Sequence, residues 1–209
     1  MLTLSRIASI LLFVLSLSFL TCAAPTPKSD ILTIRGEGAG SDAGLLLAAC
    51  VDVRAKVVAR ADDIVKTDDL ARIKADIDVV VDHLKVYADL AAKVNVVTDV
   101  DAKVKAEIAA HLIVILKAVV KISASLISKL SLSASLDLIA KLQVAVKLVI
   151  DNLNVCIVGF IDVFVKLLDD AQIKAVADVH LNVLIKLFLS IRAKLGLNVK
   201  IAGLTGVSL

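Results

Sequence analysis

The stretch DLARIKADIDVVVDHLKVYADLAAKV, residues 69–94, indicates the fold class of this chain. Its apolar residues recur at alternating steps of three and four residues, at Leu70, Ile73, Ile77, Val80, Leu84, Tyr87, Ala91 and Val94. This spacing places them on one stripe of an α-helix, whereas a half-buried strand would alternate at every second residue. The pattern therefore predicts a long amphipathic helix that buries one face.

The same alternation recurs before and after this stretch. Glycine is nearly absent between residues 44 and 196, and both prolines precede residue 28, so little interrupts long helices. Short polar or acidic residues that suit helix N-termini occur at Ser41-Asp42, Asp68-Asp69, Thr98-Asp99, Ser133 to Asp137 and Asp169-Asp170. Gly196 supplies a stop signal, and Gly159 is expected to kink or split the fourth helix. The predicted helices cover residues 42–66, 68–94, 99–130, 135–168 and 170–195.

These helices predict an all-α fold, a single-domain antiparallel bundle of about five long amphipathic helices. Short connections between the helices favour antiparallel neighbours. An extended coiled coil is the alternative, but it would carry little apolar residue outside its seam. Many positions outside the seams are apolar in this chain, which favours a bundle.

The N-terminus has the layout of a secretory signal peptide. Arg6 precedes an apolar run from Ile7 to Leu20, and small residues follow it. We expect cleavage after residue 23, a flexible lead-in or propeptide over 24–41, the bundle over 42–195 and a C-terminal tail over 196–209. The alternative is an uncleaved membrane anchor, for which the apolar run is short. The predicted location is therefore secreted, either extracellular or associated with the cell wall.

Two cysteines remain after the expected cleavage, Cys50 and Cys156. Both fall on apolar seams, so they could meet across a helix interface. Two cysteines in an oxidising compartment predict one disulfide bond. The alternative is two separate buried thiols that act as small apolar side chains.

The C-terminal half carries an excess of apolar residues. They form 59% of the chain, against roughly 45–50% in typical globular domains. The last helix has apolar residues beside or behind its seam, and lysines flank the apolar surfaces of the last two helices. The apolar surface candidates are Val179, Val183, Ile185, Leu187 and Leu189, and the basic surface candidates are Lys147, Lys166, Lys174 and Lys186.

Charge is also distributed unevenly along the chain. Residues 41–107 hold 13 acids and 10 bases, whereas residues 108–209 hold 6 acids and 11 bases. A basic and strongly apolar half is typical of helices that seek a surface. The alternative is that lysine stems cover apolar surface in an ordinary bundle.

No catalytic, metal or cofactor site is predicted. His83, His111 and His180 stand in separate helices without a second ligand at metal-binding spacing, and no serine elbow or phosphate loop occurs. Low net charge and few aromatic residues disfavour nucleic acid as a partner. No transmembrane span is expected after the leader, because charges interrupt the apolar windows.

The leader, the short lead-in and the single helical domain rich in Ala, Val, Leu, Lys and Asp resemble one family. The segment over residues 69–94 is similar to early amphipathic helices of the fungal hydrophobic surface-binding and cell wall mannoprotein family. The likeness covers the architecture over about residues 42–195 and includes no diagnostic motif. The resemblance implies an extracellular or wall-associated protein that is not an enzyme and coats hydrophobic surfaces.

Three functions follow as hypotheses. The first is a secreted binding protein for apolar or lipid-like surfaces, acting through residues 135–195. The second is a structural or effector-like interaction module whose extra apolar face forms a homodimer. The third is a carrier of a small apolar ligand.

Overall fold

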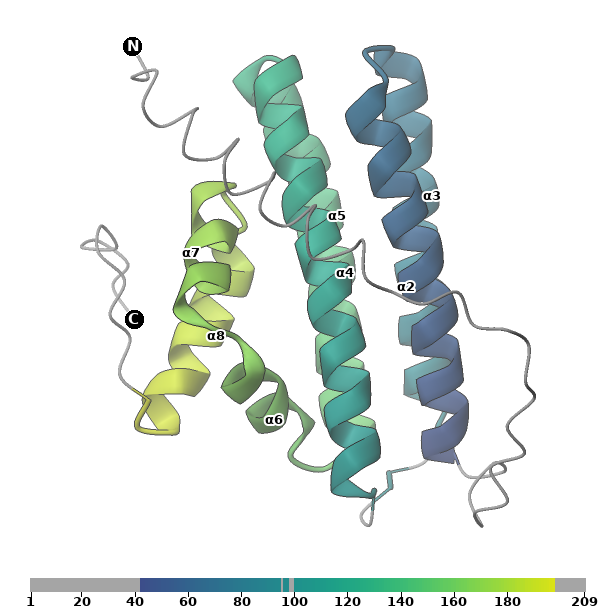
Figure 1. The fold of residues 1–209 in the computed structure, drawn as a ribbon, viewed down its shortest axis with the longest axis vertical. Coiled ribbons are helices and arrows are strands. Elements are labelled where there is room, and N and C mark those ends of the chain that lie inside the picture. Colours follow the sequence, from purple (N-terminus) through teal and green to yellow (C-terminus); the bar gives the residue numbers. More distant parts are fainter. Residues whose placement is uncertain (1–41, 95, 98–99, 198–209) are drawn as a thin grey trace, which may run out of the picture. The chain divides into compact units, whose positions relative to one another are not determined.

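The apolar seams of the sequence build the core of an all-helical structure. The computed structural model describes residues 42–94, 96–97 and 100–197, and within these residues it contains seven helices and no extended strand. The helices are α2 (Asp42–Lys66), α3 (Leu70–Lys93), α4 (Ala102–Lys129), α5 (Leu132–Cys156), α6 (Phe160–Leu167), α7 (Asp170–Asp178) and α8 (Asn182–Lys194) (Figure 1). The predicted all-α class is confirmed. The predicted leader, lead-in and most of the tail lie outside the described residues.

Aspartates begin three of these helices. Asp69 accepts hydrogen bonds from the N–H groups of Ala71 and Arg72, and Asp101 accepts one from Lys103. Asp169 forms a capping box, because its side chain accepts from the Gln172 N–H while the Gln172 side chain accepts from the Asp169 N–H. The predicted start at Asp169-Asp170 is confirmed to within one residue, and α5 begins three residues before its predicted start.

Two of the five predicted helices are divided. The fourth is split into α5 and α6 at Gly159, where φ is 73°, in the left-handed region that glycine adopts without strain. The fifth is split into α7 and α8 around His180, where φ is 63°. The N–H groups of His180 and Leu181 donate to the carbonyls of Ala177 and Val176, as in a helix end that normally has glycine at this position. Gly196 takes the corresponding role after α8, with a φ of 66°, so its predicted stop signal is confirmed.

Replacing His180 with glycine should stabilise the protein. A residue with a Cβ atom in the left-handed region costs the folded state about 1–2 kcal/mol. Glycine removes this cost, but it also raises the conformational entropy of the unfolded chain, which offsets part of the gain in stability. We expect the free energy of unfolding to rise by about 1 kcal/mol in urea titrations, with an unchanged slope. His180→Ala is the control, since alanine keeps the Cβ atom. Equal stability of the two variants would show that the backbone at residue 180 is not strained.

Not all neighbouring helices are antiparallel, which corrects the prediction. Hydrogen bonds join Cys50 to Ile108 and Asp62 to Lys121, so residue numbers rise together along α2 and α4 and these helices are parallel. Bonds from Lys141 to Asp78 and from Asn152 to the Ala88 carbonyl show the same for α3 and α5. The sequential pairs α2–α3, α4–α5 and α7–α8 are antiparallel hairpins.

The connection between α3 and α4 explains this arrangement. The N–H of Val97 donates to the carbonyl of Cys156 at 2.8 Å, and Val97 forms an isolated bridge with Ile157. The chain therefore passes the C-terminal end of α5 on its way from α3 to α4. This route places α4 beside α2. The path of the chain between α3 and α4 cannot be predicted from the helix periodicity.

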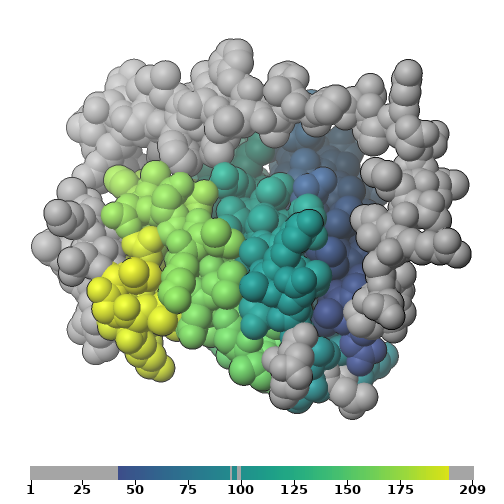
Figure 2. Space-filling model, turned by 60° about the horizontal axis from the view of Figure 1, so that its bottom comes forward, coloured from purple at the N-terminus to yellow at the C-terminus, as the bar shows by residue number. Residues whose placement is uncertain are grey.

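The helices form three layers. The pair α2 and α3 packs on one side of the pair α4 and α5, and α6–α8 pack on the other side (Figure 1). The space-filling view shows the three layers side by side at one end of the helices (Figure 2). In the third layer, buried Phe164 lies with its ring centroid 6.1 Å from that of Phe160 and 5.7 Å from that of Phe188.

The central position of α4 accounts for its composition. Among the described helices, α4 is the one that is long and apolar enough to cross a membrane by length and composition. Lys117 and Lys121 nevertheless interrupt its apolar residues. In the bundle, α4 contacts α2, α5, α6 and α7, and twelve of its residues are buried. A helix packed on several sides needs apolar residues around most of its circumference.

Candidate functional site

The structure divides the predicted apolar surface residues. Val183 is 42% exposed and lies on the surface, whereas Leu187 and Leu189 are partly buried against the core. Val179 and Ile185 are only 3% and 2% exposed, so their prediction as surface residues is wrong. The expected excess of exposed apolar residues on the last predicted helix is thus reduced mainly to Val183.

The break at His180 is the physical reason for this correction. A continuous helix over 170–195 would turn Val179 away from its buried seam and place Ile185 at the edge of that seam. In the structure, Val179 is the C-cap of α7 in the tight turn, and Ile185 joins Leu184 on the buried face of α8. The apolar residues of this region therefore pack the third layer against the central pair of helices, α4 and α5.

The four predicted basic residues lie on the outside of the central and third layers. Lys166, Lys174 and Lys186 are exposed, and Lys147 is half-buried. Lys147 pairs with Asp151 on α5, and Lys174 pairs with Asp178 on α7 at 2.7 Å. Both pairs span one helical turn, so half of the predicted basic set is already partnered within its own helix.

An apolar ridge that the periodicity analysis missed lies along the outer side of α5. Its members follow one another at steps of four residues and include a small side chain in the middle: Leu132, Leu136, Ala140, Val144 and Leu148. Val144 is 62% exposed. Val155 lies two helical turns after Leu148 on the same side of α5 and is 68% exposed. Residues four apart form a continuous ridge on a helix surface. The buried stripe of α5 through Leu142 and Val146 has the same helical spacing, so the sequence pattern alone does not distinguish the exposed ridge from it.

A hydrogen bond joins this ridge to the exposed part of α8. The side chain of Gln143, itself buried, accepts from the N–H of Val183 at 2.8 Å. This bond caps the N-terminus of α8, whose own N-cap residue Leu181 provides no side-chain cap. It also holds Val183 beside the part of α5 that carries Val144. We call this surface the α5–α8 face, formed by Leu136, Val144, Leu148, Val155 and Val183, with Lys147 and Lys186 at its side.

The two cysteines are free thiols, so the predicted disulfide is not present. The Sγ of Cys50 is directed to the carbonyl of Ile108 in α4, and the Sγ of Cys156 to that of Leu153 in its own helix. Burial raises the pKa of the Cys50 thiol to about 11 and also raises the pKa of Cys156. Both thiols therefore stay protonated at neutral pH, as small apolar side chains rather than nucleophiles.

Buried Tyr87 lies near both thiols. Its hydroxyl donates to the carbonyl of Leu46 at 3.2 Å and thereby joins α3 to α2. Burial raises the pKa of Tyr87, and the neighbouring Cys50 adds to this shift. These groups form part of the packed core and not a site open to a ligand.

The histidines are dispersed over the fold. Nδ1 of His111 on α4 lies 3.2 Å from Nη1 of Arg54 on α2, and burial together with this guanidinium lowers the pKa of His111. His83 lies on α3, and His180 in the turn between α7 and α8. Over residues 42–94, 96–97 and 100–197, no group of three or more His, Cys, Asp or Glu side chains could hold a metal ion.

The geometry thus provides one surface suited to contact with another apolar surface, namely the α5–α8 face. Exposed apolar residues that gather on one side of a protein commonly mark an interaction site. Comparisons with protein-family models, with curated proteins and with solved structures give no match to this chain.

Proposed function

We propose that the protein is a non-enzymatic binding protein that associates with apolar or lipid-like surfaces through the α5–α8 face. The observation that carries the proposal is the hydrogen bond from the Val183 N–H to Gln143, which joins the exposed start of α8 to the turn of α5 that also carries exposed Val144. Transfer of apolar side chains from water to an apolar phase is favourable by about 25 cal/mol per Å². Lysine stems at the side of this face can lie along such a surface while their charges remain in water.

The proposal includes export of the protein. Arg6, the apolar run Ile7–Leu20 and the small residues after it support a secretory leader. The helical architecture over residues 42–195 is compatible with the fungal hydrophobic surface-binding and cell wall mannoprotein family. We therefore propose a secreted protein that acts outside the cell or at the cell wall.

One observation favours a homodimer as a second candidate function. The ridge from Leu132 to Leu148 has the spacing with which helices pack ridge against groove, so another helix would also fit it. Two of the charged groups beside it are already partnered, Lys141 with Asp78 and Lys147 with Asp151, whereas exposed Asp137 forms no ion pair with a described residue. A stable dimer in light scattering, without binding to apolar beads or vesicles, would favour this candidate over the first.

Replacing Val144 and Val183 together with serine should weaken binding to apolar beads and to neutral vesicles roughly 25-fold. This magnitude follows from losing about 1 kcal/mol of burial at each half-exposed valine. Binding is measured as depletion of the protein from solution over a series of bead or vesicle concentrations. The substitutions lie on the surface, so folding should be little affected.

The chain offers a closely matched control. Val51 on α2 and Val86 on α3 are 39% and 67% exposed, close to 42% for Val183 and 62% for Val144. The double variant Val51→Ser with Val86→Ser changes the same side chains in the layer formed by α2 and α3. It should bind like the unmodified protein. Equal weakening by both double variants would show that the contact is not made by the α5–α8 face, and no binding by the unmodified protein would refute the function.

A further inference from the structure

We propose that α8 directs the protein to bilayers with anionic headgroups, in preference to uncharged apolar surfaces. This inference rests on the proposed function and specifies the chemistry of its partner. It depends on the charges of α8, on the partners of the acids around it and on the place of α8 beside the exposed valines.

The charges of α8 have a single sign. Asn182–Lys194 contains Lys186, Arg192 and Lys194 and no acid. Arg192 is 7% exposed and bonds to Asp170 and to the Leu168 carbonyl, so it contributes nothing to an outward contact. Lys186 and Lys194 are exposed, and neither forms an ion pair with any residue that the structure describes.

Most acids near α8 are already engaged. Asp170 pairs with Arg192, Asp178 pairs with Lys174, and Asp169 caps α7. On the adjoining part of α5, Asp151 pairs with Lys147. Half-buried Asp162 on α6 is the remaining acid of the third layer. The two exposed lysines of α8 are thus left with their charge uncompensated by a close carboxylate.

The lysines share a side of α8 with exposed Val183 and partly buried Leu187. Val183, Leu187 and Lys194 are separated by four and seven residues, which places them on one stripe of the helix, and Lys186 is one turn from Val183. The hydrogen bond from the Val183 N–H to Gln143 holds the start of this stripe beside α5. A surface that meets Val144 and Val183 therefore also meets these lysines.

Charge complementarity identifies the partner. Binding to a neutral apolar surface would be favoured only by the burial of the valines. The two ammonium groups would then lie beside a surface that carries no opposite charge. An anionic bilayer offers the same apolar interior together with headgroup charges, and each lysine near such a surface strengthens binding about fivefold. The combination of exposed valines and unpaired lysines therefore favours the anionic bilayer.

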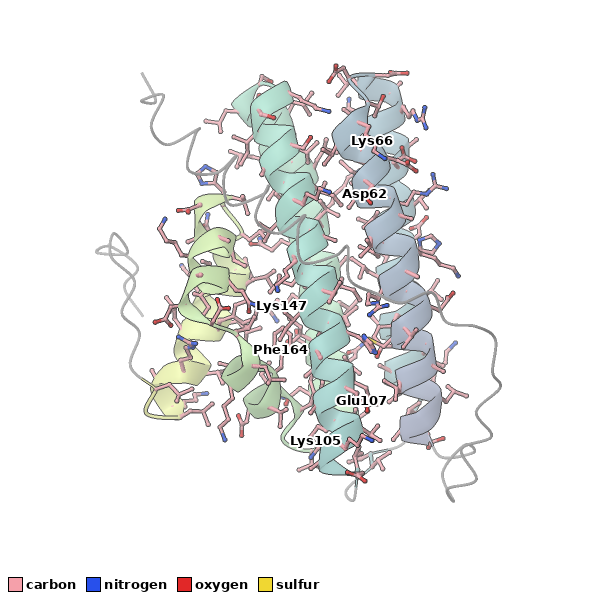
Figure 3. The ribbon with its side chains drawn as sticks, viewed as in Figure 1. Asp62, Lys66, Lys105, Glu107, Lys147 and Phe164 are labelled. Carbon is pink, nitrogen blue, oxygen red and sulfur yellow. The ribbon has the colours of Figure 1, made fainter. Side chains whose placement is uncertain are left out.

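The experiment compares sedimentation with vesicles of pure phosphatidylcholine and with vesicles that contain about 30% phosphatidylglycerol, at low and at high salt. Polystyrene beads serve as the uncharged apolar surface. The variant carries Lys186→Gln and Lys194→Gln. Its control carries Lys56→Gln and Lys66→Gln on α2, where both lysines are exposed. Helix α2 belongs to the layer on the other side of α4 from α8, and Figure 3 labels Lys66 there.

We expect the unmodified protein to bind the anionic vesicles more tightly, and the excess to disappear at high salt because salt screens exposed charges. The α8 variant should lose about 25-fold in affinity for anionic vesicles and keep its binding to beads, while the α2 control should lose little. Equal binding to neutral and anionic vesicles, or equal loss in both variants, would overturn this inference and leave the proposed function standing. A failure to bind beads and both kinds of vesicle would refute the proposed function itself.

Discussion

Replacing Phe164 with alanine should lower the free energy of unfolding by about 3–5 kcal/mol. The Phe164 side chain is fully buried on α6 and contacts the rings of Phe160 and Phe188, so it joins α6 to α8 (Figure 3). Alanine would remove its apolar burial and leave a cavity that the surrounding helices fill only in part. Urea unfolding followed by circular dichroism gives the change in free energy.

Phe164→Leu is the control, since it keeps most of the apolar volume and should cost less than about 1.5 kcal/mol. The alanine variant should also bind apolar beads more readily, because loosening of α6–α8 uncovers apolar residues of α4 and α5. A loss below about 1 kcal/mol would show that the third layer contributes little to the cooperative fold. Strong destabilisation without increased bead binding would show that the third layer does not shield the central pair.

The helix positions could be predicted because burial imposes a period on the sequence. The predicted seam of α2, which includes Leu46, Val57 and Ile64, is buried throughout, and so are Ile73, Ile77, Val80, Leu84, Tyr87 and Ala91 of the predicted seam of α3. Each of these helices buries one stripe against the core, so the side chains report the period directly. The glycine signals were also informative, since Gly159 and Gly196 both adopt positive φ where the sequence indicated a break or a stop.

The division of the last helix could not be predicted in the same way. His180 adopts the left-handed conformation at a helix end where glycine is usual, and the hydrogen bonds of the turn stabilise it. No proline or glycine marks this position. The apolar period continues from α7 into α8, because both helices bury a face in the same layer.

The candidate surface was predicted only in part for a related reason. Val183 was correctly placed on the surface, but Val144 was missed, because it belongs to a helix that is buried on its other sides. An apolar residue on such a helix has the same local pattern whether it faces a neighbouring helix or water. Which faces of α5 are covered depends on the path of the chain past its end at Val97 and on the docking of α8 through Gln143. Both are tertiary contacts that helix periodicity does not encode.

Replacing Arg192 with methionine should lower the free energy of unfolding by about 2 kcal/mol. The buried guanidinium donates to the Asp170 carboxylate at the start of α7 and to the buried carbonyl of Leu168, so it ties the end of α8 to the junction of α6 and α7. Methionine fills similar space but leaves that carbonyl without its charged donor, which typically costs 1.5–3 kcal/mol. The cost is moderated by two features. Asp170 is half-exposed and regains water, and the Nε of Arg192 has no partner to lose.

Two further variants separate the hydrogen bonds from the ion pair. Arg192→Lys keeps the charge but has no planar fork to reach both acceptors, so it should restore only part of the stability. Asp170→Asn removes the ion pair and keeps the bond to the Leu168 carbonyl, so it should cost less than the methionine variant. Unfolding in urea ranks the three variants. An asparagine variant as unstable as the methionine variant would assign the stabilisation to the exposed ion pair, and the buried bond to Leu168 would then not be what ties α8 to this junction.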